Sequence, residues 1–377
     1  MKNPWIEIVQ SPDLSDIPTP GSSNYPWHAM FACQLGVMDH QSWAGLRWGF
    51  NAGILFEEAL ERQRLFLESQ HSYDVEQGLE FSAIRAIAFR FINTDRGLSI
   101  VLIGKVTAKT KEQVEVLAFD YFRELTSTFP YDYILAPATT RDKFNEVTGF
   151  ELFTENDDCL DVVQIKRCEN PIPANRKLPF MQGLWQSGGR SHEQIWRSLV
   201  SAKQRIIFNV ILRPTVLYDN DMAIYANLSS EFENYQPDKE NEKVFHLYKE
   251  WYENFIVRRL TPWKKYFYLQ FHIVSSDVIN ENLIRSIGTV LTQSLQMQNP
   301  KSQILHGYQI VRPPLKRRRE WAEKIYNMHI VSWDSKLPNP RLSEIADLDE
   351  VFSAIRLPYS PPGSETLGFK YLPVENE

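Results

Sequence analysis

The segment Tyr266-Phe267-Tyr268-Leu269-Gln270-Phe271-His272-Ile273 sets the fold of the second half of this chain. Its odd-numbered positions are large and apolar, while Tyr268, Gln270 and His272 lie between them. Because side chains alternate between the two faces of a strand, the pattern predicts a β-strand with one apolar and one polar face. The polar face has two interpretations: Tyr266, Tyr268 and His272 could stack on single-stranded bases, or they could pack beneath a helix.

Helical and strand patterns alternate on both sides of this segment, across residues 192–345. The predicted elements are a helix over 192–202, a strand over 206–212, helices over 219–233 and 238–259, the strand quoted above, a helix capped by Asp277, a strand over 304–311, and a basic helix from Pro313 to about Met328. Strands separated by helices indicate an α/β module.

Residues 79–168 predict a first module of the same kind. Ile87, Phe89 and Phe91 alternate with smaller or polar neighbours, and a second alternating run follows after a turn, so the pair indicates a hairpin. Thr110 begins a helix with a capping-box pattern, and a short strand and a short helix come next. We therefore predict the α+β class, with two α/β-sandwich modules that each contain a mixed sheet.

Three other regions complete the predicted domain organisation. Residues 1–78 form an irregular, Pro/Gly-rich and aromatic-rich N-terminal segment with one helix over 56–67. Residues 169–191 contain three prolines and three glycines and predict a linker. Residues 346–377 form a C-terminal tail broken by Pro and Gly, which cannot continue as one long helix.

Composition limits the class of protein. The chain has 377 residues, 43% of them apolar, and a net charge of −6. The negative charge argues against nonspecific coating of nucleic acid. Ten Trp, 16 Tyr and 22 Phe suit a protein that buries surface against a partner. Three irregularly spaced cysteines, no signal peptide and no long apolar run predict a cytoplasmic protein without a membrane span.

The C-terminal region carries a family resemblance. The run from Asp349 to Pro358 contains Phe352 and ends in Ile355-Arg356-Leu357-Pro358, before a segment rich in Pro, Gly and Ser. The stretches 196–200 and 205–215 add a Trp-Arg-x-Leu and a Leu-Arg-Pro-Thr pattern. Together they resemble the non-motor half of HerA/FtsK-like, conjugation-type bacterial ATP-binding proteins, over roughly residues 80–370.

The resemblance implies an adaptor that frames and oligomerises a motor. The phosphate-binding pattern G-x-x-x-x-G-K-[S/T] does not occur in the sequence, so we expect no nucleotide cofactor, no enzymatic activity, and a motor ATPase on a separate chain. In the related proteins the matching stretch joins adaptor to motor. We therefore predict that the tail docks the partner ATPase through Phe352, Ile355, Arg356, Leu357, Pro358, Leu367 and Phe369.

The alternative function is nucleic-acid binding without an ATPase, through the basic helix 312–328. Its cations are Arg312, Lys316, Arg317, Arg318 and Arg319. They could contact phosphates, form a solvated helix face, or clamp an acidic partner.

Other reactive residues predict no site. His28, Cys33, Asp39 and His40 fit no closed zinc motif, and no His lies near Cys159 or Cys168 in the sequence to activate a nucleophile. We expect no catalytic, cofactor-binding or metal-binding residues.

Overall fold

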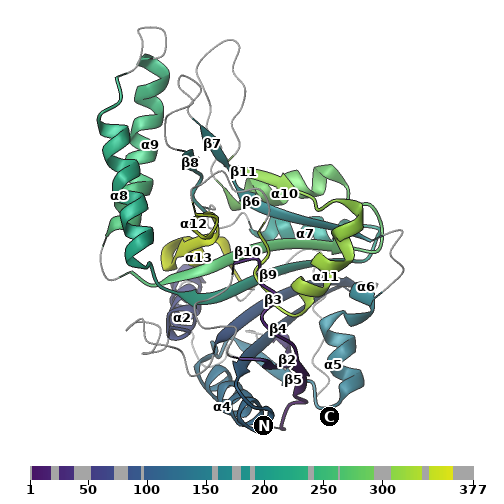
Figure 1. Cartoon of the computed structure of the whole chain (residues 1–377). Helices are drawn as coiled ribbons and strands as arrows, with labels where there is room; N and C mark the ends of the chain where they lie inside the picture. Colours follow the sequence, from purple (N-terminus) through teal and green to yellow (C-terminus); the bar gives the residue numbers. More distant parts are fainter. Residues whose placement is uncertain are drawn as a thin grey trace.

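The computed structural model (Figure 1) describes residues 2–17, 25–37, 52–71, 84–94, 97–154, 160–171, 180–186, 192–236, 242–261, 264–292, 307–332 and 339–359. Within these residues, ten strands form one sheet with the order β1-β2-β4-β3-β9-β10-β6-β11, and β5 and β12 pair with β2 and β10. Every pairing is antiparallel. The strands are β1 (Glu7–Gln10), β2 (Trp27–Val37), β3 (Arg85–Thr94), β4 (Gly97–Ala108), β5 (Tyr133–Pro137), β6 (Asp161–Arg167), β9 (Ile206–Thr215), β10 (Tyr266–Ser275), β11 (Tyr308–Val311) and β12 (Ile345–Asp347).

Helices cover both faces of the sheet. One face packs against α2 (Ala52–Ser69), α4 (Lys111–Thr128), α7 (His192–Ser201), α10 (Glu281–Leu291) and α13 (Leu348–Ala354). The other packs against α5 (Arg141–Thr148), α6 (Phe150–Thr154), α8 (Asp219–Glu233), α9 (Glu242–Leu260), α11 (Arg318–Tyr326) and α12 (Arg341–Glu344). The pair α8 and α9 extends beyond the sheet (Figure 1).

Strand β10 is confirmed and lies near the middle of the sheet, between β9 and β6. All ten of its residues are buried. Phe267 belongs to one hydrophobic core and Tyr268 to the other, so the strand separates the two cores as its alternation predicts. Because Tyr266, Tyr268 and His272 are all buried, the polar face of this strand packs inside the protein and offers no surface for stacked bases.

The α+β class is confirmed, but the division into two sandwich modules with mixed sheets needs correction. Strand β3 of the predicted first module pairs with β9 of the second, for instance Phe89 with Val210. Strand β6, also from the first, lies between β10 and β11. A single sheet leaves no open strand edge at the predicted boundary, where two separate sheets would each expose unpaired backbone groups.

Two predicted irregular regions also contain regular structure. The N-terminal segment contributes β1 and the eleven-residue β2, which pairs with β4 from Trp27 to Leu35. Strand β2 shows little alternation because both of its faces are buried. The predicted linker contains two short antiparallel strands, β7 (Glu169–Pro171) and β8 (Phe180–Gln182). It also contains Trp185, which is buried with its ring centroid 4.6 Å from that of Phe271.

The sheet face that packs on α5 and α11 carries buried cations. Arg90 on β3 donates hydrogen bonds to the carbonyl oxygens of Thr148 (2.9 Å) and Tyr326 (2.7 Å), at the last turns of α5 and α11. Lys105 on β4 donates to the carbonyl of Asn327 at 2.5 Å. The last carbonyls of a helix have no partner within the helix, so these side chains stabilise both helix ends.

Candidate functional site

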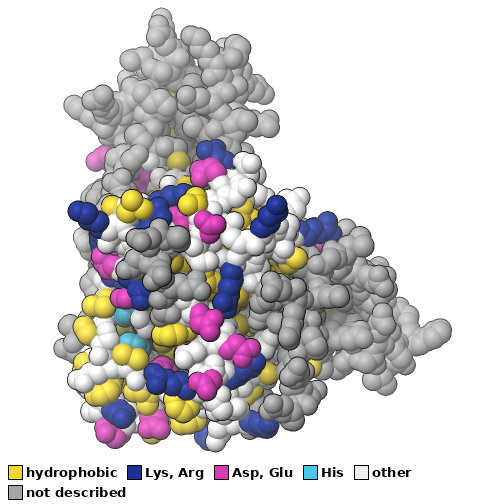
Figure 2. Space-filling view, turned by 90° about the vertical axis from the view of Figure 1, so that its right-hand side faces the viewer, with side chains coloured by type: hydrophobic (Ala, Val, Ile, Leu, Met, Phe, Trp, Pro, Cys, Tyr) yellow, Lys and Arg dark blue, Asp and Glu magenta, His cyan; other side chains and the backbone are white. Residues whose placement is uncertain are grey.

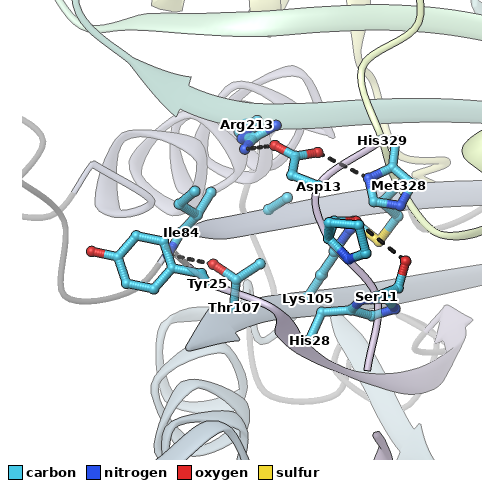
Figure 3. Close-up of a pocket in the computed structure, with 12 residues that line it drawn as sticks. Ser11, Asp13, Tyr25, His28, Ile84, Lys105, Thr107, Arg213, Met328 and His329 are labelled. Carbon is cyan, nitrogen blue, oxygen red and sulfur yellow. Dashed lines mark hydrogen bonds and ion pairs between the residues drawn. The ribbon is translucent and has the colours of Figure 1, made fainter. Parts of the chain in front are cut away.

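A polar pocket lies on the same sheet face, beneath the N-terminal segment (Figure 3). The charged and imidazole side chains that line it come from five places in the fold: Asp13 from the stretch between β1 and β2, His28 from β2, Lys105 from β4, Arg213 from β9, and His329 from the loop after α11. Each of these side chains is more than nine-tenths buried. Such a concentration of buried titratable groups is the feature of this fold most typical of a functional site.

Asp13 joins three parts of the chain. Its carboxylate accepts a hydrogen bond from Arg213 at 2.9 Å and from Nδ1 of His329 at 3.0 Å. Two residues further on, the Ser15 hydroxyl accepts from the backbone N–H of Ile330 at 2.9 Å. These bonds hold the N-terminal segment against the sheet and the loop after α11.

The backbone conformation at the end of α11 places His329 in the pocket. The N–H of Met328 bonds to the carbonyl of Ile325, and the N–H of His329 bonds to the carbonyl of Lys324 at 2.8 Å. This is the Schellman pattern, which places a residue in the left-handed region just after the helix. Met328 occupies that position with φ of 55°, where glycine is usual, and its side chain is 1% exposed and lines the pocket.

Burial and mutual charge set the protonation states in the pocket. Burial lowers the pKa of Lys105 to about 7, that of His28 to about 3 and that of His329 to about 4, so both imidazoles are neutral at pH 7. For Asp13, burial acts to raise the pKa, but the hydrogen bond from His329 and the positive charge of Arg213 hold it well below its usual range. The pocket therefore holds one carboxylate, one permanent cation and an amine that titrates near neutrality.

The size of the pocket limits its chemistry. The cavity volume is about 10 Å³, roughly the space of one water molecule, so no organic substrate fits in it. Among the residues that the structure describes, no group of three or more His, Cys, Asp or Glu side chains is arranged to hold a metal ion. The arrangement is suited to fixing three chain segments to one another.

Comparison with protein-family models and with curated proteins finds no match for this chain.

The predicted docking segment lies on the chain's own core as far as Tyr359. Ile355, Leu357 and Pro358 are buried, and Phe352 is partly buried beside Arg356, whose guanidinium lies 4.1 Å from the ring centroid. Leu367 and Phe369 fall outside the described residues. Binding of a partner by this segment stays a prediction, and of its described residues Phe352 and Arg356 retain exposed surface.

A buried ion-pair network fixes the helix that precedes this segment. Glu350 on α13 pairs with Arg167 on β6 at 3.1 Å and with Arg259 on α9, and all three side chains are fully buried. Asp347 pairs with Arg258, and Asp347 and Glu350 cap α13 reciprocally. These pairs join β6, α9, β12 and α13 at the start of the C-terminal segment. Removing Glu350 would leave the buried Arg167 without a carboxylate partner, which is strongly destabilising.

The predicted nucleic-acid residues are mostly engaged with acids. Arg317 pairs with Glu320 and Arg319 with Glu323, while Arg312 and Arg318 both pair with the buried Asp161; Lys316 is exposed. Figure 2 shows Lys and Arg side chains interleaved with Asp and Glu across the face that includes α11. The region begins as a 3-10 turn, Leu315–Arg317, rather than as one continuous basic helix.

Of the cysteines considered above, the structure describes Cys33 and Cys168. Cys33 is buried on β2, which raises the pKa of its thiol to about 12, so it has no nucleophilic character at neutral pH. Cys168 is partly buried, and Asp39, His40 and Cys159 lie outside the described residues. None of the described helices is long and apolar enough to cross a membrane.

Sequence reasoning missed the pocket except for His28. One signal was available: Lys105 lies within the apolar run of β4, and Arg213 lies at the end of the apolar run of β9. A cation inside a strand that is otherwise apolar indicates a buried, partnered charge.

Proposed function

We propose that this chain is a non-catalytic, cytoplasmic adaptor for a HerA/FtsK-like translocase ATPase. The support begins with the three stretches that carry the family resemblance. Residues 205–215 contain all of β9 in the middle of the sheet, and residues 196–200 lie on α7. Residues 349–358 cover most of α13 and the segment after it. The three stretches are far apart in the sequence but belong to one hydrophobic core.

The observation that carries the proposal is the fixed path of the segment after α13. Nε2 of His192 on α7 bonds to the carbonyl of Ala354 at 3.0 Å, and the backbone N–H of Leu357 donates to Gln63 on α2 at 3.1 Å. Phe56 on α2 then contacts the ring of Tyr359, with centroids 5.8 Å apart. A segment that connects an adaptor to a motor needs a fixed position on the adaptor, because a motor attached through a flexible linker would not keep its orientation.

A binding experiment tests this proposal. A HerA/FtsK-like motor core from the same organism is immobilised, and capture of the full chain is measured by surface plasmon resonance. The double variant Phe352→Ala/Arg356→Ala removes the exposed part of the segment while leaving Ile355 and Leu357 in the core. We expect weaker capture by a variant that stays folded but is less stable, because the Phe352 ring is partly buried against the core. Leu315→Ala, on the opposite side of the sheet and 76% exposed, is the matched control.

Two outcomes of this binding measurement would contradict parts of the proposal. Absence of micromolar binding between the unaltered chain and the motor core would reject the adaptor role. Binding that the double variant leaves at full strength would keep the adaptor role but reject this segment as its contact.

A further inference from the structure

Three buried polar atoms around the pocket have no hydrogen-bond partner within the described chain. They are Nε2 of His28, Nε2 of His329 and Nε of Arg213. The three residues are 2%, 1% and 4% exposed, and all line the same cavity (Figure 3). A buried polar group without a hydrogen-bond partner is destabilising, so three such atoms around one cavity indicate a shared partner that occupies it.

The chemistry of the pocket defines what that partner must supply. The Asp13 carboxylate is ionised and can only accept a hydrogen bond, so Nδ1 of His329 must be the protonated nitrogen. Because burial keeps this imidazole neutral, its Nε2 carries a lone pair and needs a donor. Nε of Arg213 always carries a hydrogen and needs an acceptor. The partner must therefore donate and accept at once.

This requirement excludes two other ligand classes. A small anion cannot donate to Nε2 of His329. A soft metal cation could use the two imidazole nitrogens and the thioether of Met328, but it would lie beside the guanidinium of Arg213 and the amine of Lys105, which repel it. A neutral molecule the size of water meets the donor, acceptor and charge requirements together.

We propose that the pocket is a binding site for one water molecule, which accepts a hydrogen bond from Nε of Arg213, donates to Nε2 of His329 and hydrogen-bonds to Nε2 of His28. The imidazole rings of the two histidines lie 6.1 Å apart at 85°, and the cavity of about 10 Å³ matches the space one water needs. This water links β2, β9 and the end of α11, where Asp13 already holds the N-terminal segment. The inference is independent of the adaptor function.

A high-resolution crystal structure of the full chain, with anomalous data, tests the inference. We expect one density peak about 2.7–3.2 Å from the three nitrogens, without anomalous signal. An anomalous peak would show an ion and overturn the proposal, as would direct bonding between the orphaned atoms with no density between them.

Solution measurements give a second test that does not need crystals. Nitrogen-15 NMR of labelled histidine should show His329 protonated at Nδ1 and unprotonated at Nε2; the opposite tautomer would contradict the donor argument. Titration with Cu(I) should leave both histidine spectra unchanged. Stoichiometric binding that shifts both rings would identify a metal site in place of the water.

Discussion

Shortening Leu357 to Ala tests whether the C-terminal segment is part of the core. Leu357 is 4% exposed and packs into the core that contains α2 and α13, and its backbone N–H bond to Gln63 survives the change. Truncation of a buried Leu to Ala lowers the free energy of unfolding by about 2–5 kcal/mol, through lost burial and the cavity left behind. We expect about 3 kcal/mol here. A freely exposed docking tail would give less than about 0.5 kcal/mol.

Urea unfolding followed by tryptophan fluorescence measures this change, since the chain has ten Trp. The shift in the unfolding midpoint multiplied by the slope m gives the difference in free energy. Leu315→Ala, at a side chain that is 76% exposed, is the control and should change stability by less than about 0.5 kcal/mol. If Leu357→Ala matched that control, the packing of residues 355–359 described above would be refuted.

Three further predictions concern charged side chains. Arg90→Met should lower the free energy of unfolding by about 3 kcal/mol or more, because the carbonyls of Thr148 and Tyr326 lose a charged donor; calorimetry that finds an unchanged melting temperature would contradict this. Lys105 has a pKa of about 7 in the folded chain and 10.5 as its ordinary value, so the unfolded chain binds more protons between these pH values. Stability should therefore rise from about pH 7 to pH 9, by up to about 1.4 kcal/mol per pH unit from this group, and Lys105→Met should remove that slope in urea titrations. Arg318→Ala should destabilise the fold without altering the salt dependence of any DNA binding, because its guanidinium bonds to the carbonyl of Leu160 and pairs with Asp161; a reduced salt slope in fluorescence anisotropy would instead support phosphate contact.

The sequence by itself determined most of the elements. Alternation predicts β10, β9 and the β3–β4 hairpin. Helical spacing predicts α7 and α8 close to their observed bounds, the start of α4, and α2 without its first turn. Thr110 caps α4 by accepting from the N–H of Gln113, and Gly149 ends α5 with φ of 72°. These features are local: a cap, a turn or a face depends on residues only a few positions apart.

The tertiary structure decided how the elements combine and where the polar side chains meet. Nothing in the sequence of β3 specifies β9 as its neighbour, because strand pairing is chosen by which apolar faces can be buried together. For the same reason the pocket could not be predicted: Asp13, Arg213 and His329 come from positions about 200 and 316 residues apart. From its sequence alone, the C-terminal segment is predicted to be a tail. In the structure it is hydrogen-bonded to Gln63 and His192, and the helix before it is paired with Arg167. A burial site for such a segment exists only after the sheet and its helices have assembled.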